Sequence, residues 1–315
     1  MTRKITHALN TRYSMSLFYN MTTVISIVAI DKINNQLHPT LSLLISTLIS
    51  VLFFNLVNLG HLKKLYAIAY SDFSLTLVIN LIIAGLWIGS FYSLYYIDPF
   101  SYIFIFSSVP AIISTWIDKK NRIVCSLLVF IFILYLVILL THVNHSYIGI
   151  LCALLSGLFS YLYRKINYFY TKKYQLSASM CLAIRSYGII FFCIPILLYL
   201  HWFQPATLLI YGNYNQIPIS ILIVTLFSFI LPLYLNQKAL QNSGVHAHNL
   251  ITSFIPFMVI FISYFMGIEK THLIEFKIIL SLSFSLFIII SLTAHKLRKF
   301  QYEHIRKLYK KNKTR

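Results

Sequence analysis

The chain has 315 residues, of which 58% are hydrophobic and 10% are charged, and its mean hydropathy is +0.76. Soluble domains contain about 25% charged residues, so this composition excludes an ordinary soluble domain and indicates a polytopic membrane protein. The net charge of +19 comes from basic residues that gather in short loops and a tail. Topology control and anionic lipid headgroups account for basic residues placed there, so we expect no nucleic-acid partner.

Apolar runs long enough to cross a bilayer follow one another along the chain. A hydrocarbon core about 30 Å thick needs about 20 helical residues. The first run begins at Tyr13 and has no Ala-x-Ala-like cleavage site after it, so we expect it to be retained as a signal anchor. The runs predict ten transmembrane helices, near residues 13–31, 38–58, 73–95, 98–117, 123–141, 146–164, 178–200, 217–238, 245–266 and 273–293.

Lysine and arginine are distributed unevenly between alternate loops of this assignment. One side collects 22 of them, Arg164 included, and the other side has only Lys32 and Lys270. Because basic loops remain in the cytoplasm, the asymmetry predicts that both termini are cytoplasmic and that the number of spans is even.

Ten spans divide into two halves of five, at residues 1–142 and 143–294, followed by a basic cytoplasmic tail at 295–315. Five is an odd number, so the second half would enter the membrane in the opposite orientation to the first. The expected fold is therefore an all-α polytopic membrane protein whose ten transmembrane helices form a 5+5 inverted repeat. Carriers with this arrangement place the substrate near the midplane, between the halves.

Two stretches, Leu81–Ile117 and Ile221–Lys270, repeat one design: an apolar run, a short polar joint and a second apolar run. Ser107-x-x-Pro110 in the first stretch corresponds to Ser253-x-x-Pro256 in the second. A proline deep in a spanning helix frees a backbone carbonyl, which protein or a water-lined cavity must satisfy. We therefore expect Pro110 and Pro256 to be paired helix breaks that line a cavity.

The second half carries a family resemblance. Its motifs are Ile148–Lys165, Leu235–Leu240, Ser243-Gly244, Ser253–Pro256 and Gly267–Thr271. With these motifs the sequence resembles the second half of EamA-type carriers of the drug/metabolite transporter superfamily over about Gly149–Ile290. The resemblance implies a secondary transporter that works by alternating access, without covalent chemistry or a cofactor, and export as the commonest role.

Arg185 lies about two turns inside the predicted seventh span, with no acidic residue near it in the sequence. Charged side chains inside spans are costly, so a functional placement is the default hypothesis. Two interpretations stay open. The side chain either snorkels to the inner leaflet, or faces a cavity where its forked donors suit a carboxylate or phosphate of the substrate.

Polar and aromatic residues inside the spans supply the other candidate binding residues. Asn80 and Trp87 share one helix face, and Asn249 and Ser253 lie one turn apart, just before Pro256. Taken singly, each candidate fits a hydrogen bond between helices better than a ligand contact. The full set of candidate substrate-binding residues is Arg185, Asn20, Asn80, Trp87, Tyr92, Ser107, Pro110, Tyr187, Asn236, Asn249, Ser253 and Pro256.

Several kinds of chemistry are disfavoured by what the spans lack. No aspartate or glutamate falls in the middle of a predicted span, which argues against proton-coupled export of organic cations. The sequence has no Gly-rich phosphate loop, no His-Glu-x-x-His and no CxxC pair, and its four cysteines lack metal-ligand spacing. His246-x-His248 is only a weak metal pattern. We expect no enzyme activity, no cofactor and no metal.

The sequence thus predicts a secondary active transporter of a small polar metabolite, amino-acid-like or otherwise zwitterionic or anionic, and favours export. The alternative is a non-transporting membrane scaffold or a lipid-handling partner subunit. Expected partners are the small-molecule substrate and, through residues 295–315, anionic lipids of the inner leaflet. A homodimer stays open. The expected location is a bacterial cytoplasmic (inner) membrane, with an endomembrane as the alternative.

The topology can be tested by cysteine labelling in a background without the native cysteines. Because the charge asymmetry places residues 204–215 outside, an Asn213→Cys variant should react with an impermeant thiol reagent added to intact cells. Protection at that position, together with labelling of Lys172→Cys, would reverse the predicted orientation.

Overall fold

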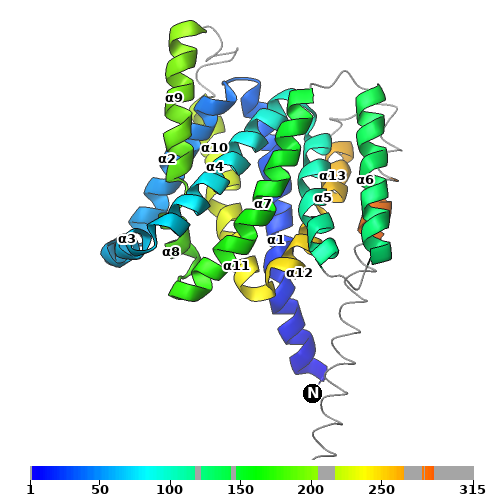
Figure 1. Cartoon of the computed structure of the whole chain (residues 1–315), viewed down its shortest axis with the longest axis horizontal. Helices are drawn as coiled ribbons and strands as arrows, with labels where there is room; N and C mark the ends of the chain where they lie inside the picture. Colours follow the sequence, from blue (N-terminus) through cyan, green and yellow to red (C-terminus); the bar gives the residue numbers. More distant parts are fainter. Residues whose placement is uncertain are drawn as a thin grey trace, which may run out of the picture.

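A computed structural model describes residues 2–117, 122–142, 147–204, 217–265, 279 and 281–286, and these residues are almost entirely helical. No β-sheet occurs among them. Nine helical segments in this part of the chain are long and apolar enough to cross a membrane. The prediction of an all-α, multi-pass membrane protein is therefore confirmed (Figure 1).

The spans before residue 143 are continuous helices. Prolines occupy the first helical position of the second and fourth spans, where a missing backbone N–H costs nothing. Next to them, His38 Nδ1 accepts from the Thr40 amide at 3.3 Å, and an Asp98 oxygen accepts from the Ser101 amide at 3.0 Å. The elements are α1 (Thr2–Asn34), α2 (Pro39–Val57), η1 (Leu59–His61), α3 (Leu62–Ser71), α4 (Phe73–Tyr96), α5 (Pro99–Ile117) and α6 (Arg122–His142).

The spans after residue 146 are more irregular. The second of them is divided into α8 and α9, the third contains a π-helical segment, η4, and the fourth is divided into α12 and α13. Of the predicted tenth span, only 279 and 281–286 are described, and the basic tail at 295–315 lies outside the described residues. The elements are α7 (Tyr147–Tyr174), α8 (Ala178–Ala183), α9 (Tyr187–Phe203), α10 (Ile217–Val224), η4 (Thr225–Ile230), α11 (Leu231–Ser243), α12 (Val245–Thr252) and α13 (Ile255–Phe265).

The predicted end of the sixth span, at residue 164, is wrong. Helix α7 continues to Tyr174. Its C-terminal end contacts Asp72, which lies between α3 and α4. The Asp72 carboxylate accepts from Lys173 Nζ at 2.7 Å and from the Tyr174 hydroxyl at 2.8 Å. These two hydrogen bonds, the one from Lys173 foremost, lower the pKa of Asp72. Arg164 is thus an interior residue, 1% exposed, and removing it from the loop count leaves 21 basic residues against two.

Of the two predicted proline breaks, one is wrong. Helix α5 runs through Pro110 without interruption. The carbonyl of Phe106, which residue 110 cannot bond, faces Gly157 of α7, where an added Cβ would stand 3.1 Å from that oxygen. In the second stretch, which contains Pro256, the helix is interrupted at Ser253 and Phe254, between α12 and α13. Pro256 lies in the first turn of α13.

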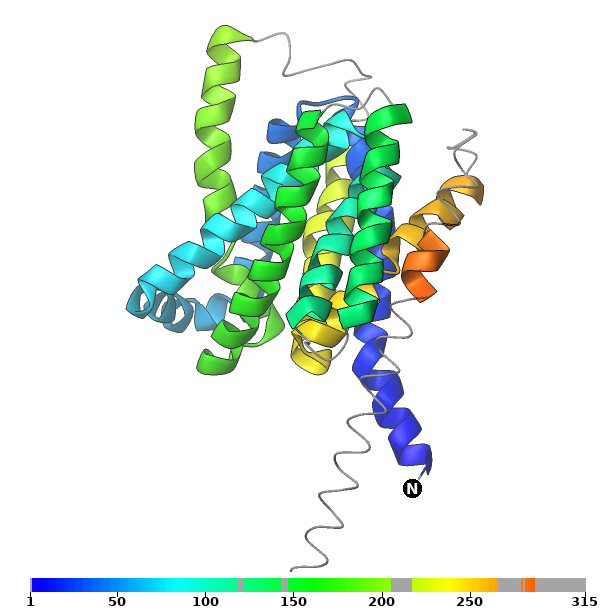
Figure 2. The same ribbon diagram turned by 45° about the vertical axis from the view of Figure 1, so that its right-hand side comes forward.

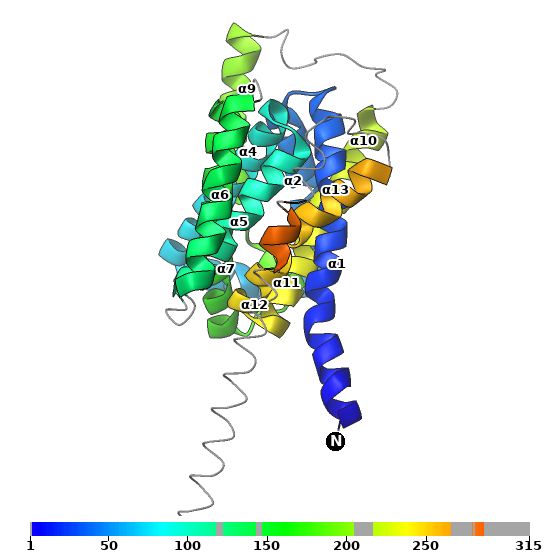
Figure 3. The same ribbon diagram turned by 90° about the vertical axis from the view of Figure 1, so that its right-hand side faces the viewer.

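The core lies where helices from the two parts of the sequence meet. Helix α7 packs against α4 and α5, and α1 packs against α11, η4 and α12. Close approach between α4 and α7 requires small residues, since a Cβ on Gly89 would stand 3.0 Å from the Cys152 carbonyl. Figures 2 and 3 show that α6 stands beside α5 at the edge of the bundle and that α1 extends past the other helices at its N-terminal end.

Gly188, in the first turn of α9, makes the closest of these approaches and provides a test of the packing. A Cβ at this position would stand 2.4 Å from the Asn80 carbonyl oxygen, so Gly188→Ala must push α9 away from α4. We expect a loss of about 1–3 kcal/mol or more in the free energy of unfolding, measured by denaturant or thermal unfolding in detergent. Gly60→Ala is the matched control, because nothing lies within 4 Å of its added Cβ. Equal stability of the two variants would contradict this packing.

Candidate functional site

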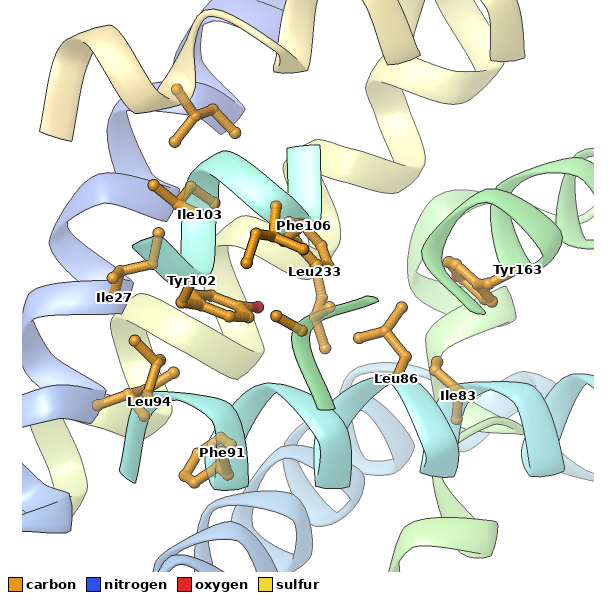
Figure 4. Close-up of a cluster of buried hydrophobic side chains, with 14 of the residues drawn as sticks. Ile27, Ile83, Leu86, Phe91, Leu94, Tyr102, Ile103, Phe106, Tyr163 and Leu233 are labelled. Carbon is orange, nitrogen blue, oxygen red and sulfur yellow. The ribbon is translucent and has the colours of Figure 1, made fainter. Parts of the chain in front are cut away.

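A cavity with about 50 Å³ of room for the centres of water-sized molecules lies among α1, α4, α5, α7, η4 and α11, and we call it the central cavity. Residues from both halves of the sequence line it. Figure 4 shows the apolar side chains that converge between these helices, with the Tyr102 hydroxyl pointing into their midst. The aromatic lining residues are Tyr19, Trp87, Tyr102, Phe106 and Tyr163, and the polar ones are Thr23, Ser26, Ser90, Ser160, Arg164, Ser228 and Asn236.

Aromatic rings give the central cavity rigid walls. The rings of Trp87 and Phe229 lie 4.4 Å apart between centroids, which joins α4 to η4. The Tyr102 hydroxyl donates to Ser90 Oγ at 2.8 Å, and Ser90 Oγ lies 2.7 Å from Ser156 Oγ. Amphipathic rings of this kind offer a large apolar contact and a few fixed polar atoms, as is typical of small-molecule sites.

Among the described residues that line the central cavity, Arg164 is the only basic one. Its Nη1 donates to Asn249 Oδ1 at 2.8 Å and to Thr252 Oγ1 at 2.9 Å. Asn249 is held in turn, since its Nδ2 donates to Ser114 Oγ at 2.8 Å. The acceptors of Arg164 Nη1 are thus neutral oxygens of α12, and none of the described acidic residues lines the cavity. Among the described residues, the positive charge of Arg164 therefore has no acidic counterpart in the cavity.

A second polar cluster fixes the position of Asn236 on the cavity wall. His248 is fully buried, with its Nε2 2.7 Å from Asn236 Oδ1 and its Nδ1 3.0 Å from Ser16 Oγ. An amide oxygen can only accept, so Nε2 carries the proton and Nδ1 accepts from the Ser16 hydroxyl. The neutral imidazole thus connects α1, α11 and α12. Within the described residues, no group of three His, Cys, Asp or Glu side chains is placed to hold a metal ion.

Arg185 lies at the break between α8 and α9, next to Ser186, whose φ of 83° is left-handed. The break is held from α4 and α2: Asn80 Oδ1 accepts from the Gly188 amide at 3.1 Å, and Asn55 Nδ2 donates to the Ala183 carbonyl at 3.2 Å. Arg185 is 1% exposed, so the interpretation that it snorkels to the leaflet is wrong.

The Arg185 guanidinium makes no hydrogen bond, and its Cζ lies 4.9 Å from the centroid of the Tyr163 ring. Tyr163 lines the central cavity, whereas Arg185 does not. Arg185 lies instead beside a small gap, with about 10 Å³ of room for the centre of a water-sized molecule, together with residues of α4, α7 and α8. No polar atom is exposed in the lining of this gap, so the Arg185 guanidinium does not point into it.

The structure brings only two of the predicted binding residues, Trp87 and Asn236, to the central cavity. Asn249 does not line the cavity, but it accepts a hydrogen bond from Arg164, which does. The remaining ones make other contacts. Asn20 donates to the Ile251 carbonyl, Tyr92 bonds Thr40, Tyr187 bonds Tyr66, Asn80 caps the α8–α9 break, Ser253 bonds the Leu250 carbonyl, and Ser107, Pro110 and Pro256 are buried outside the cavity lining.

Sequence reasoning missed Arg164 as an interior residue and did not select Tyr163 or Gln237. The signal was present in α7: Tyr168, Phe169 and Tyr170 follow Arg164, and a second basic pair, Lys172-Lys173, comes two residues later. Aromatic residues next to a basic pair are typical of a membrane interface. That pattern places the true end of the span about two turns beyond the predicted one.

No protein-family model matches the chain, and no curated protein matches it either. Among solved structures, one described only as "Crystal structure of protein" has a similar fold, with a TM-score of 0.61 at 12% sequence identity. The match covers 89% of this chain and 98% of that chain. A likeness at this identity concerns the fold alone. Fold and site together define a multi-pass helical membrane protein with a positively charged internal cavity.

His248 provides a test of the cluster behind the cavity. His248→Ala would leave Ser16 and Asn236 buried without their partner, so we expect a loss of about 1–3 kcal/mol in the free energy of unfolding. His246→Ala, on the same helix but partly exposed, should lose less. Added zinc or nickel should not change the unfolding of the wild-type protein. Equal losses in the two variants, or metal stabilisation that depends on His248, would contradict this structural role.

Proposed function

We propose that this protein is a secondary carrier for a small metabolite with a carboxylate or phosphate group, zwitterionic or anionic. The observation that carries the proposal is the central cavity, enclosed by helices of both halves and holding the Arg164 guanidinium without a described carboxylate beside it. A substrate anion would supply the missing charge. Forked N–H donors suit the two oxygens of a carboxylate or phosphate.

The packing of the helices supports a 5+5 inverted repeat. Such a repeat requires that each contact between two spans recur after both are shifted by five. The contact of α4 with α7 has its counterpart in that of α11 with α1, and the contact of α5 with α7 in that of α12 with α1. Likewise, α4 contacts α9 and η4 contacts α2. In this arrangement α6 would correspond to the predicted tenth span, near 273–293.

A repeat of this kind favours alternating access. The central cavity lies at the contact between the halves, so rocking one half against the other would open it to one side and then to the other. We further propose that both termini are cytoplasmic, that the membrane is a bacterial cytoplasmic membrane, and that the carrier belongs with the EamA-type exporters. These points rest on the charge asymmetry and on the motifs around Leu235–Pro256.

A lipid-handling role is the second candidate, and a groove on the side of the molecule favours it. Helices α3, α4 and α9 enclose an open, largely apolar groove whose walls face away from the core. Phe73 and Phe191 are 62% and 71% exposed there, which fits contact with acyl chains. The polar side chains of its lining are few: the Tyr66 and Tyr187 hydroxyls, which meet there, and those of Tyr70, Thr76 and Asn80.

A ligand screen separates the two candidates. Purified protein in liposomes would be tested for thermal stabilisation by water-soluble carboxylate and phosphate metabolites, because a ligand that binds the folded state raises its apparent stability. We expect at least one specific stabiliser. Arg164→Gln should weaken its binding about tenfold or more, a loss of about 1.5–3 kcal/mol, as for other hydrogen bonds to charged groups.

Lys165→Gln is the matched control, since it removes the same charge one residue further along α7 from an exposed side chain. It should leave the affinity unchanged. Equal affinities of the Arg164→Gln variant and the wild type would exclude Arg164 from the substrate site. Stabilisation by lipids alone, with no response to soluble anions, would favour the lipid-handling candidate.

A further inference from the structure

The groove among α3, α4 and α9, which we call the lateral groove, has far more room than the central cavity. It offers about 630 Å³ to the centres of water-sized molecules, against about 50 Å³ in the central cavity. Its lining on α4 extends from Phe73 to Leu81, which is about 12 Å of helix. The hydrocarbon part of one leaflet is about 15 Å thick, so the lateral groove accommodates most of the length of an acyl chain.

The walls of the lateral groove suit such a chain. Its exposed apolar side chains are Phe73, Leu77 and Leu81 of α4 and Phe191 and Phe192 of α9. Both helices belong to segments that are long and apolar enough to cross a membrane, so the groove opens toward the hydrocarbon of the bilayer. Lipid chains therefore surround the groove, and no partner protein is needed to cover it.

One end of the lateral groove carries basic and aromatic side chains of α3. This helix connects the end of α2 to the start of α4, so it lies at the ends of these spans (Figure 1). Lys63 precedes Tyr66 by one helical turn, so the two share the face of α3 that lines the groove. Lys63 and Lys64 are exposed, as is Tyr70. Lysine and tyrosine at the end of a span are typical of the level of the lipid headgroups.

The charge at this end of the groove is positive. Asp72, which follows α3, is already paired, because its carboxylate accepts from Lys173 Nζ at 2.7 Å. Within the described residues, neither Lys63 nor Lys64 takes part in an ion pair. Two unpaired ammonium groups at the headgroup level attract the phosphate of an anionic lipid.

We propose that the lateral groove binds one anionic phospholipid, with an acyl chain between α4 and α9 and the phosphate at Lys63 and Lys64. This lipid is a resident of the fold and not a cargo, so the site does not depend on the transport function or on the lipid-handling candidate. A second copy of the chain fits the groove less well, because a symmetric contact through it would bring the lysines of the two copies together.

A lipid bound in the lateral groove would contact the break between α8 and α9. Ile184, Tyr187 and Gly188 lie at this break and also line the groove. The Tyr187 hydroxyl meets the Tyr66 hydroxyl of α3 there. An acyl chain would therefore pack across α3, α4 and α9 where the backbone of the span is irregular.

The test measures lipid binding to delipidated full-length protein in detergent by native mass spectrometry. Phosphatidylglycerol and phosphatidylcholine with the same acyl chains are titrated separately, and the Kd of the first bound lipid is determined. Phosphatidylglycerol should bind more tightly. The double variant Lys63→Gln, Lys64→Gln should bind it about tenfold more weakly or worse, since each basic residue near an anionic lipid contributes about fivefold in affinity.

Further variants locate the bound lipid. Leu77→Trp fills the lateral groove without changing the charge, so it should also weaken the binding of phosphatidylglycerol. Ile133→Trp, on the exposed face of α6, is its matched control and should bind like the wild type. The double variant Lys310→Gln, Lys311→Gln removes two charges from the basic tail, and Arg164→Gln removes one from the central cavity. Both should keep the wild-type Kd.

Four results would overturn the proposal. The two lipids might bind the wild type equally, or phosphatidylglycerol might bind the α3 double variant or Leu77→Trp as tightly as the wild type. The tail variant or Arg164→Gln might weaken binding as much as the α3 double variant does, which would place the lipid elsewhere. Dissociation of a dimer by Leu77→Trp, without any lipid preference, would assign the groove to a second copy.

Discussion

Two guanidinium groups in the interior set the main physical constraint on this protein. Arg164 and Arg185 are each 1% exposed, and neither has a carboxylate partner among the described residues. An uncompensated charge in a protein interior costs several kcal/mol, so the surrounding helices must recover that free energy elsewhere. For Arg164 they do so with Asn249 and Thr252 of α12. The Asn249 amide is fixed in turn by Ser114 of α5, so the positions of three helices depend on one cation.

Irregular backbone is concentrated in the spans after residue 146. In the described part of the chain, the spans formed by α1, α2, α4, α5 and α6 are unbroken, whereas three later spans are interrupted. Each interruption exposes backbone groups that a bilayer cannot satisfy, and each is met by a side chain of another helix. At the α8–α9 break, Asn80 bonds the Ile184 carbonyl and the Gly188 amide. Ser50 donates to the Phe229 carbonyl in η4. Asn20 donates to the Ile251 carbonyl, just before the break between α12 and α13. Continuous helices of the first half thus stabilise discontinuous helices of the second.

Much of the fold could be predicted because the lengths of the apolar runs determine where helices can cross a bilayer. The bounds of α2, α4, α5 and α6 fall within a residue or two of the predicted spans. Helix α3 was missed because a ten-residue amphipathic helix has no such signal.

The binding residues were harder to predict, because a sequence shows that a polar residue lies within a span but does not show which neighbour its side chain meets. Asn80 and Trp87 share a helix face, yet one caps a helix break and the other lines the central cavity. Arg164 was assigned to a loop because a basic pair normally ends a span.

The two cationic sites meet at one residue. Tyr163 lines the central cavity, stacks on Arg185 and hydrogen-bonds Asn167 and Gln237. The Tyr163 hydroxyl and Asn167 Nδ2 both donate to Gln237 Oε1, so two residues of α7 join this helix to α11. The ring of Tyr163 thus separates the Arg185 guanidinium from the central cavity, and its hydroxyl is held in place by the same amide that fixes Asn167.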